Sequence, residues 1–575
     1  MRRPSSLSLA LVFCAPATLV ASNAFAAEFF VDPAAAAGGD GSTQSPWQTL
    51  EQVVAAGEFG STIKAGDTVW LRSGYHGAFA IKNGDYTPPI TIAAAAGQQP
   101  TLSRVSFSAT KGWVFAGASI SPSYATTPEV GTLVTTDKSS ARITVKDCEL
   151  FSVTDTSAWG VTEWIESASS GVSVRGPEVT ISNNDITNVR FGISVDGADA
   201  LIDNNRIVNF SADGLRGLGD NGVFQYNLVK NVYVSGDDGD SNHDDGFQSW
   251  SVGDEGVGTG VVKGVVLRGN VFINREDPDQ KLSNSMQGIG CFDGMFDGWV
   301  VENNVVITDH WHGITFSGMT NSRIVNNTVI DLNDAKPGPP WIKVGPHKDG
   351  TSSSNVIVRN NLATDYDLED TAVTDDHNAT LSSATLATFF VSPTGPFDLH
   401  LLPDAPAIDT GSADHAPALD ADGIPRPQGK GIDLGAYEWH AATVVPIDGG
   451  AVGGGTGGAS ATGGAAGRTG SGGASAAGGA TGRARAGGAT GQAGTGGTTT
   501  TGGAAGQPGA GGNIAMGGAA GGTTAGLAPP AKDQGGCSGG LTGAPTVHGV
   551  WALAVLGALG FRRRQRCLNH PTRHR

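Results

Sequence analysis

Acidic and imidazole side chains gather in one short segment of the chain, at a density that indicates chemistry. Residues 237–245 read Asp-Asp-Gly-Asp-Ser-Asn-His-Asp-Asp. Clustered carboxylates beside a glycine suit a hard cation that prefers oxygen ligands. We therefore expect Asp238, Asp240 and Asp244 to bind calcium, the one cofactor that the sequence indicates. The alternative is a solvated acidic loop, and the spacing lacks the closing Glu of an EF-hand.

A column of polar residues follows from short segments that repeat along the chain. Each segment begins with glycine and continues with an apolar residue, as in Gly192–Val195 and Gly313–Phe316. When the segments are aligned, the residues just before the glycine are Asp213, Asp245, Gln287 and His312. The outward positions after it hold Arg216, Gln248, Thr315 and Lys343, and then Trp250 and Phe292. Polar groups beside aromatic faces are typical of sugar-binding grooves.

We divide these candidates between catalysis and binding. The expected catalytic residues are Asp245, His312, Lys343 and Arg216. The expected substrate-binding residues are Gln248, Gln287, Trp250, His243 and His310. His310 and His312 could share one face of a strand, as zinc ligands do, but no third ligand is evident because His243 lies two coils away. A structural role is the main expectation for His310.

A second repeat describes the scaffold that must position these residues. An apolar residue, two variable residues, an asparagine, a variable residue and another apolar residue recur along the chain. The asparagines are Asn184, Asn205, Asn227, Asn270, Asn304, Asn327 and Asn361. The shorter intervals match one coil of a parallel β-helix, and the longer ones match a coil plus a loop. We expect the asparagines to stack one coil apart, to tolerate left-handed backbone and to satisfy buried turn amides.

Alternation along the glycine segments predicts which side chains enter the core. The inward residues, one per coil, are Ile193, Leu215, Phe247, Ile289, Ile314 and Ile342. Cys291 then also faces inward, and we expect Cys291 and Cys148 to be free thiols because several coils separate them. The insertions Val232–Asp244, Asn274–Met286 and Asp331–Pro340 all precede a glycine segment or its variant copy, so they should form a wall at one corner.

The ends of the chain and its composition indicate export. Residues 1–26 combine two arginines, an apolar run and a small-residue cleavage site, as in a secretory signal peptide. Residues 27–440 form the expected β-helix with its N-terminal cap, and 441–535 a disordered linker rich in Gly, Ala and Thr. An apolar stretch followed by arginines makes 536–575 a C-terminal membrane anchor. The net charge of −18 disfavours nucleic acid as a partner.

Motifs at both ends of the body resemble those of known β-helix proteins. Ser45–Leu50 and Gly66–Leu71 are similar to the opening of secreted bacterial β-helices, and Asp422–Pro427 and Asp433–Glu438 to their closing motif. With the repeats, residues 28–440 resemble the pectate-lyase-like superfamily of right-handed parallel β-helices. This resemblance implies an all-β solenoid. The glycine-rich linker, Cys, apolar helix and Arg cluster at the end resemble the myxobacterial sorting signal.

The leading functional hypothesis is a lyase that cleaves an acidic, uronate-containing polysaccharide by β-elimination. This reaction needs a cation that neutralises the substrate carboxylate, a base and an acid. Calcium, Arg216 or Lys343 would neutralise the carboxylate, and His312 or Lys343 would be the base. We expect the protein to work as a monomer at the cell surface or outside the cell.

Three alternatives stay open at this point. An alginate-type C5-epimerase would share the first half of the lyase reaction. A polygalacturonase-type glycoside hydrolase would use Asp213, Asp244 and Asp245 as acids, together with His312 and Gly313. A non-catalytic surface protein that binds glycans would need only the groove and the anchor.

Overall fold

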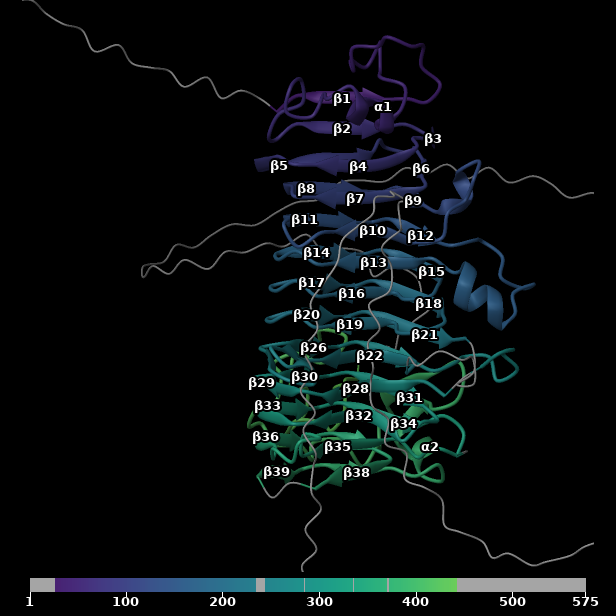
Figure 1. The fold of residues 1–575 in the computed structure, drawn as a ribbon. Coiled ribbons are helices and arrows are strands. Elements are labelled where there is room, and N and C mark those ends of the chain that lie inside the picture. The colour runs from purple at the N-terminus through teal and green to yellow at the C-terminus, as the bar shows by residue number, and fades with distance from the viewer. Residues whose placement is uncertain (1–25, 234–242, 284, 335, 370–371, 442–575) are drawn as a thin grey trace, which may run out of the picture. The chain divides into compact units, whose positions relative to one another are not determined.

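The computed structural model describes residues 26–441, apart from 234–242, 284, 335 and 370–371. Within these residues the chain winds into a parallel β-helix in which each coil contributes a strand to three sheets (Figure 1). The all-β prediction is therefore confirmed for this part of the chain. The predicted signal peptide, linker and anchor lie outside the described residues, except for residues 26 and 441. No helix among the described residues is long and apolar enough to cross a membrane.

Three parallel sheets, here called sheets I, II and III, follow one another along each coil. Sheet I holds β4 (Ala78–Lys82), β7 (Arg104–Ser108), β10 (Thr132–Thr136), β13 (Ser170–Val174), β16 (Ile193–Val195), β19 (Leu215–Gly217), β22 (Asp245–Trp250), β28 (Gln287–Asp293), β32 (His312–Ser317), β35 (Trp341–Gly345) and β38 (Asp365–Leu368). Sheet II holds β1 (Glu28–Val31), β2 (Thr68–Leu71), β5 (Asp85–Ala94), β8 (Lys111–Ala116), β11 (Ala141–Lys146), β14 (Val179–Ser182), β17 (Leu201–Asp203), β20 (Val223–Gln225), β25 (Val261–Lys263), β26 (Val266–Arg268), β29 (Met295–Asp297), β30 (Val300–Glu302), β33 (Met319–Val325), β36 (Ser354–Arg359) and β39 (Val373–Asp376). Sheet III holds β3 (Gly74–Tyr75), β6 (Pro100–Leu102), β9 (Ser119–Ile120), β12 (Glu149–Phe151), β15 (Asp185–Val189), β18 (Arg206–Phe210), β21 (Leu228–Val232), β27 (Val271–Ile273), β31 (Val305–Thr308), β34 (Thr328–Asp331), β37 (Leu362–Ala363) and β40 (Ala379–Thr380).

The predicted asparagine ladder forms the corner between sheets II and III. The Asn205 backbone N–H donates to Oδ1 of Asn227 at 2.9 Å, and the Asn205 side-chain amide donates to the same oxygen at 3.0 Å. The same pair of bonds recurs from Asn184 to Asn361. Asn378 extends the ladder by one further coil. Stacking one coil apart is thus confirmed, and each step satisfies a buried turn amide.

One detail of the ladder differs from the prediction. The left-handed backbone belongs to the residue before each ladder asparagine, for example Asn183 at φ 55° and Asn326 at φ 54°. The ladder asparagine itself has ordinary backbone and turns its amide inward along the stack. Left-handed backbone favours asparagine at the preceding position. These two separate requirements explain why the motif so often contains two consecutive asparagines.

The core inside the coils is apolar and continuous. The six predicted inward residues of sheet I are at most 1% exposed. Cys148 and Cys291 are buried free thiols, as predicted, and burial raises the pKa of Cys291 well above its usual range. At the N-terminal end, α1 (Leu50–Ala55) begins at Thr49, whose side chain accepts the Gln52 N–H, and packs against β4. This helix stands at the N-terminal end of the coils, where the cap was expected.

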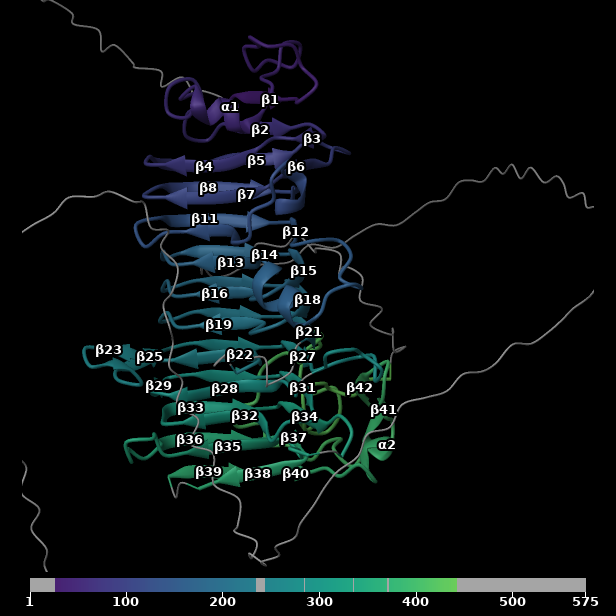
Figure 2. The ribbon, with the colours of Figure 1, turned by 45° about the vertical axis from the view of Figure 1, so that its right-hand side comes forward.

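The C-terminal part of the body folds back onto the outside of sheet III. There, α2 (Leu386–Phe389), β41 (Phe390–Ser392) and β42 (Asp398–Leu401) lie beside β31 and β34 (Figure 2). The residues that follow close the packing with a fully buried ion pair between Arg426 and Glu438, at 2.7 Å. The predicted closing motif therefore packs against the outer face of the coils.

The ladder predicts a specific cost of mutation. Asn227→Ala removes the acceptor of two Asn205 hydrogen bonds and the donor to Ile202 at 2.9 Å. Because these groups are buried, we expect unfolding by urea to show a loss of about 2–3 kcal/mol. Gln225→Ala, on the preceding strand and partly exposed, is the control and should cost less than about 0.5 kcal/mol. Equal losses for both variants would contradict the role of the ladder.

The closing segment predicts a pH dependence. His400 contacts Asp398 and Asp422, each at 2.6 Å. Burial alone would lower the pKa of His400, but the two carboxylates raise it to about 9. The stabilisation is therefore complete below the unfolded pKa of about 6.5 and is lost as the pH rises through about 9.

His400→Gln tests this dependence. Thermal melts between pH 6 and 10 should show that the difference in stability from the unmodified chain, about 3 kcal/mol at most, shrinks as the pH rises. His415→Gln is the control, because His415 is 43% exposed and lies 3.6 Å from Asp414. A difference that stays constant across this range would refute the assignment.

Candidate functional site

The loops that connect sheet III to sheet I stand at one corner of the coils, as predicted. The three predicted insertions precede β22, β28 and β35. Two further insertions that the sequence analysis did not single out lie at the same corner. They contain η1 (Pro122–Tyr124) and η2 (Glu163–Ser167). The wall therefore starts nearer to the N-terminus than expected.

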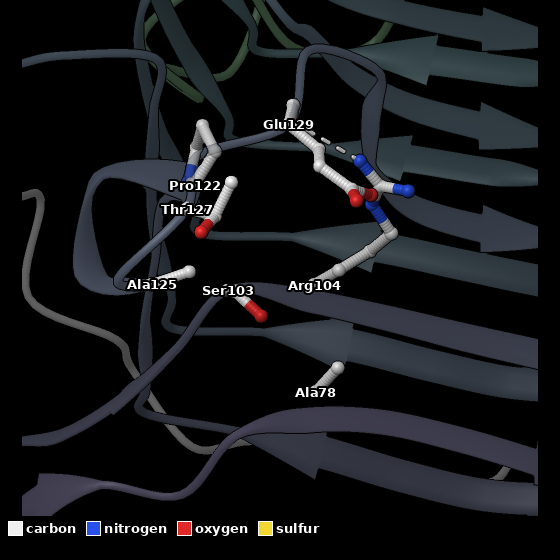
Figure 3. A pocket seen from close by; sticks show the side chains of 7 residues that line it. All are labelled: Ala78, Ser103, Arg104, Pro122, Ala125, Thr127 and Glu129. Atoms are coloured by element: carbon white, nitrogen blue, oxygen red, sulfur yellow. Dashed lines mark hydrogen bonds between the residues drawn. The ribbon is translucent and has the colours of Figure 1, made fainter.

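Two hollows lie along this wall. One, of about 210 Å³, is lined by Ala78, Ser103, Arg104, Pro122, Ala125, Thr127 and Glu129 (Figure 3). The other, of about 500 Å³, is lined in part by Glu166, Arg190 and Phe191. The second hollow adjoins the predicted site, because the Arg216 guanidinium lies 4.2 Å from the centre of the Phe191 ring.

The predicted column exists in the register of sheet I. Asp245 is directly opposite Gln287, and Ile289 opposite Ile314 carries the same register on to His312. At the other end, the backbone N–H of Asp245 donates to Oδ1 of Asp213 at 3.1 Å. The structure thus brings Asp213, Asp245, Gln287 and His312 together on successive strands.

Asp213 has a structural task in this column. Its second carboxylate oxygen forms an ion pair with Arg216. The Arg216 guanidinium also lies between two aromatic rings, 4.2 Å from Phe191 and 5.2 Å from Trp250. Arg216 is therefore held in place by a carboxylate and two rings. Trp250, expected to bind substrate, packs against this cation.

Asp245 differs from Asp213 because its carboxyl group forms no ion pair with any described residue. Its side chain is fully buried, and neither oxygen forms a hydrogen bond of good geometry with a described residue, although the Gln248 side chain approaches closely enough to lower the carboxyl pKa in part. The buried Oε1 of Gln287 also has none there. Burial and the charges of Asp213 and Asp244 raise the pKa of Asp245 well above its usual range. Burial and like charges of this kind favour the protonated form of a carboxyl group.

The Asp245 carboxyl group occupies space that is open because residue 290 is a glycine and has no side chain. Gly290 lies opposite Gln248 and Thr315 in the outward column. A Cβ atom on Gly290 would overlap Oδ1 of Asp245 and approach the Phe292 ring to 2.7 Å. Phe292 and Asp245 therefore share the room above this glycine. A β-bulge places Asp293, and not Phe292, opposite Trp250, which corrects the predicted alignment of these two aromatic residues.

His312 is enclosed by its neighbours. Its ring contacts Phe292 at 4.7 Å and Trp341 at 5.4 Å between centroids. Its Nδ1 lies 3.0 Å from the Thr315 hydroxyl, which accepts the Trp341 indole N–H at 3.1 Å. The Thr315 hydroxyl therefore links the His312 ring to the Trp341 indole and fixes the orientation of the imidazole.

The surroundings of His312 do not favour proton transfer near neutral pH. Burial, together with the nearby charges of His310, Lys343 and His243, lowers the pKa of His312 to about 2. His312 is therefore a neutral hydrogen-bonding group and a weak base.

The two other candidate histidines, His310 and His243, have different surroundings. Nδ1 of His310 accepts the backbone N–H of His312 at 3.1 Å, and burial lowers the pKa of His310 to about 4. This fits the structural role that was expected for His310 over substrate binding. His243 is partly buried beside Phe292, with ring centroids 6.3 Å apart. Gln248, also expected to bind substrate, is only 4% exposed.

Lys343 does not suit the role of a base. Its ammonium lies 2.6 Å from Asp367 and 2.8 Å from Glu369. Burial alone would lower the pKa of Lys343, but the hydrogen bonds to these carboxylates outweigh burial and raise it. A group that holds its proton this firmly cannot abstract one from a substrate. The sequence analysis missed both carboxylates because the next coil lacks the glycine pattern.

The analysis also missed an aromatic pair beside Lys343. Trp311 and Trp341 are stacked, with centroids 6.2 Å apart and planes 18° from parallel. Trp311 is 39% exposed. The signal was present in the two tryptophans, which come just before a glycine segment and at the start of its variant copy.

The predicted calcium site can be followed only in part. Asp244 is 8% exposed and adjoins Asp245. Asp238 and Asp240 lie outside the described residues. Within the part of the chain that the structure describes, no group of three or more His, Cys, Asp or Glu residues is arranged to hold a metal ion.

Comparisons with known proteins concern the architecture. Residues 170–363 match the family model described as a right-handed β-helix region, which fits the predicted handedness for these coils. Pectate lyase Pel9A is 16% identical over 72% of this chain and 96% of its own, with a TM-score of 0.36. A rhamnogalacturonan lyase is 14% identical over 62% of this chain and 86% of its own, with a TM-score of 0.33. PfbA, a surface adhesin of Streptococcus pneumoniae, is 9% identical over 55% of this chain and 80% of its own, with a TM-score of 0.30. A search of curated sequences found no match.

The room above Gly290 generates a test of the site. Gly290→Ala should displace the Asp245 carboxyl or the Phe292 ring, because the new methyl group overlaps both. We expect the affinity of this variant to fall at least about tenfold, a loss of about 1.4 kcal/mol, for a glycan that the unmodified chain is first shown to bind. Gly345→Ala, also in sheet I, is the control, since its Cβ would meet no described atom closer than 3.5 Å. Equal behaviour of the two variants would exclude the space above Gly290 from the site.

Proposed function

We propose that this chain is an exported β-helix enzyme that hydrolyses a glycosidic bond in a polysaccharide, with Asp245 as the general acid. The observation that carries the proposal is the fully buried Asp245 carboxyl group, whose oxygens form no hydrogen bond of good geometry with a described residue and have only the Gln248 side chain close by. Buried polar groups are nearly always hydrogen-bonded, so an exception in a polar column indicates a role outside the apo structure. The neighbouring amide, imidazole and indole groups suit sugar hydroxyls and ring faces.

The chemistry follows from two carboxyl groups in different environments. A protonated acid donates to the leaving glycosidic oxygen, while an ionised carboxylate takes a proton from the attacking water. Asp245 is the acid. Asp213 is bound to Arg216, so we assign the role of base to Asp244, the next residue in the chain. We assign the proton of the neutral His312 ring to Nε2, so that it donates to a substrate oxygen. Because Asp245 is buried, the substrate ring must displace Phe292 from above Gly290.

β-Elimination is less well supported by the described residues. A lyase or an epimerase needs a cation available to the substrate carboxylate and a base for the C5 proton. Arg216 and Lys343 both form ion pairs with carboxylates of the protein, and the pKa of His312 is lowered to about 2. A calcium ion held by Asp238, Asp240 and Asp244 would be the remaining neutralising group, and it stays a prediction.

The site of action follows from the chain ends, which are outside the described residues. We propose that residues 1–26 direct export and that 536–575 attach the protein to the membrane or cell envelope. The polysaccharide is then met at the cell surface or outside the cell.

The proposed acid gives a direct test. Asp245→Asn should lower the release of reducing ends from polysaccharides by about 10²–10⁴-fold, the usual contribution of a general acid. Because the pKa of Asp245 is raised, its protonated form persists to higher pH than for an ordinary Asp. Activity should therefore fall as the pH rises through this pKa, well above the usual range of an Asp.

Two controls separate catalysis from stability. Asp365→Asn, at the exposed start of β38, should retain activity. A pKa that is raised on folding means that stability is lost as the pH rises through it, so Asp245→Asn should be at least as stable as the unmodified chain at alkaline pH. Full activity of Asp245→Asn, or products that carry unsaturated uronides, would refute hydrolysis by this acid.

A further inference from the structure

The stacked tryptophans end the outward column of sheet I with an exposed apolar face. Trp311 is the one tryptophan among the exposed large apolar side chains in the described part of the chain. Trp341 lies behind it, and the Lys343 ammonium is 5.4 Å from the centre of the Trp341 ring. His312 contacts both rings, so this face is continuous with the proposed site.

The charges around this face add up to a negative value. Lys343 contributes one positive charge, and Asp367 and Glu369 contribute two negative charges within 2.8 Å of it. Their side chains are 30% and 52% exposed, so the carboxylate oxygens remain accessible. The Lys343 side chain is only 19% exposed. A ligand that reaches this end of the column therefore meets carboxylates more readily than the cation.

We propose that Trp311, Trp341, Asp367 and Glu369 form a subsite for an uncharged pyranose ring, and that the two carboxylates select against uronates. This inference rests on the proposed function and names its substrate class. The apolar face of a neutral sugar stacks on an indole, and its hydroxyl groups donate to carboxylate oxygens. A uronate carboxylate would approach two like charges, and Lys343 is already engaged by them. The proposed substrate is thus a neutral polysaccharide, in place of the acidic polysaccharide that the sequence analysis expects.

Affinity electrophoresis tests the subsite. The host is the Asp245→Asn chain, so that cleavage plays no part and the proposed function can fail independently. Gels contain a soluble β-glucan, a xylan, a galactomannan, polygalacturonate or alginate. We expect retardation by at least one neutral polymer and by neither uronate polymer. Trp311→Ala should weaken this retardation by at least about tenfold. Tyr75→Ala, which alters a side chain of the same 39% exposure on sheet III, should leave it unchanged.

Releasing Lys343 tests the selection against uronates. In the same host, Asp367→Asn with Glu369→Gln should create retardation by polygalacturonate or alginate, because the cation becomes available. Glu369→Gln alone, at the more exposed position, should show a smaller gain and guards against misfolding of the double variant. Glu276→Gln, which frees Lys230 from a similar 2.7 Å pair on sheet III, is the control and should show no gain.

Three results would overturn the inference. They are retardation of the host by a uronate polymer that Lys343→Met abolishes, the absence of retardation by every neutral polymer, and unchanged binding after Trp311→Ala. Binding of a neutral polymer without any hydrolysis by the unmodified chain would instead refute the proposed function and leave this subsite supported.

Discussion

From Asn184 to Asn378 each coil turns between sheets II and III and buries the amide of that turn, and the asparagine ladder meets this requirement. Each ladder side chain accepts the backbone N–H of the preceding coil and donates to a carbonyl of that same coil, as Asn227 does for Asn205 and Ile202. This fixes the spacing of successive coils at about 4.8 Å and their register. Sheet I inherits that register, and the column containing Asp245 and Gln287 exists only because of it.

The same rigidity explains how an unpartnered acid is tolerated. A buried carboxyl group costs free energy unless it is neutral or paired, so Asp245 is held protonated among Asp213, Asp244 and apolar neighbours. The strands on either side are continuously paired through β19, β22 and β28. Because these coils are held together by continuous strand pairing and by the ladder, they tolerate the free-energy cost of the buried carboxyl group without rearranging. Stability is thus concentrated in the ladder and the core, and chemistry in one column.

The fold could be predicted because its signals are local and repeated. The asparagine motif, the inward residues such as Phe247 and the corner insertions all recur at coil spacing. The environment of the site could not be predicted in the same way. Lys343 meets Asp367 and Glu369 from the next coil, and His312 loses basicity under Phe292 and Trp341. These effects depend on contacts between side chains of neighbouring strands and on a β-bulge after Ser249. The repeat pattern encodes neither of them.

The account depends most on Asp245 being a neutral acid in the folded protein. Infrared difference spectroscopy between the unmodified chain and Asp245→Asn at pH 7 measures this without a substrate. We expect a carbonyl stretching band of a protonated carboxylic acid that is present in the unmodified chain, is absent in the variant and shifts in deuterium oxide. A carboxylate band in its place would show that Asp245 is ionised and would contradict its role as the acid.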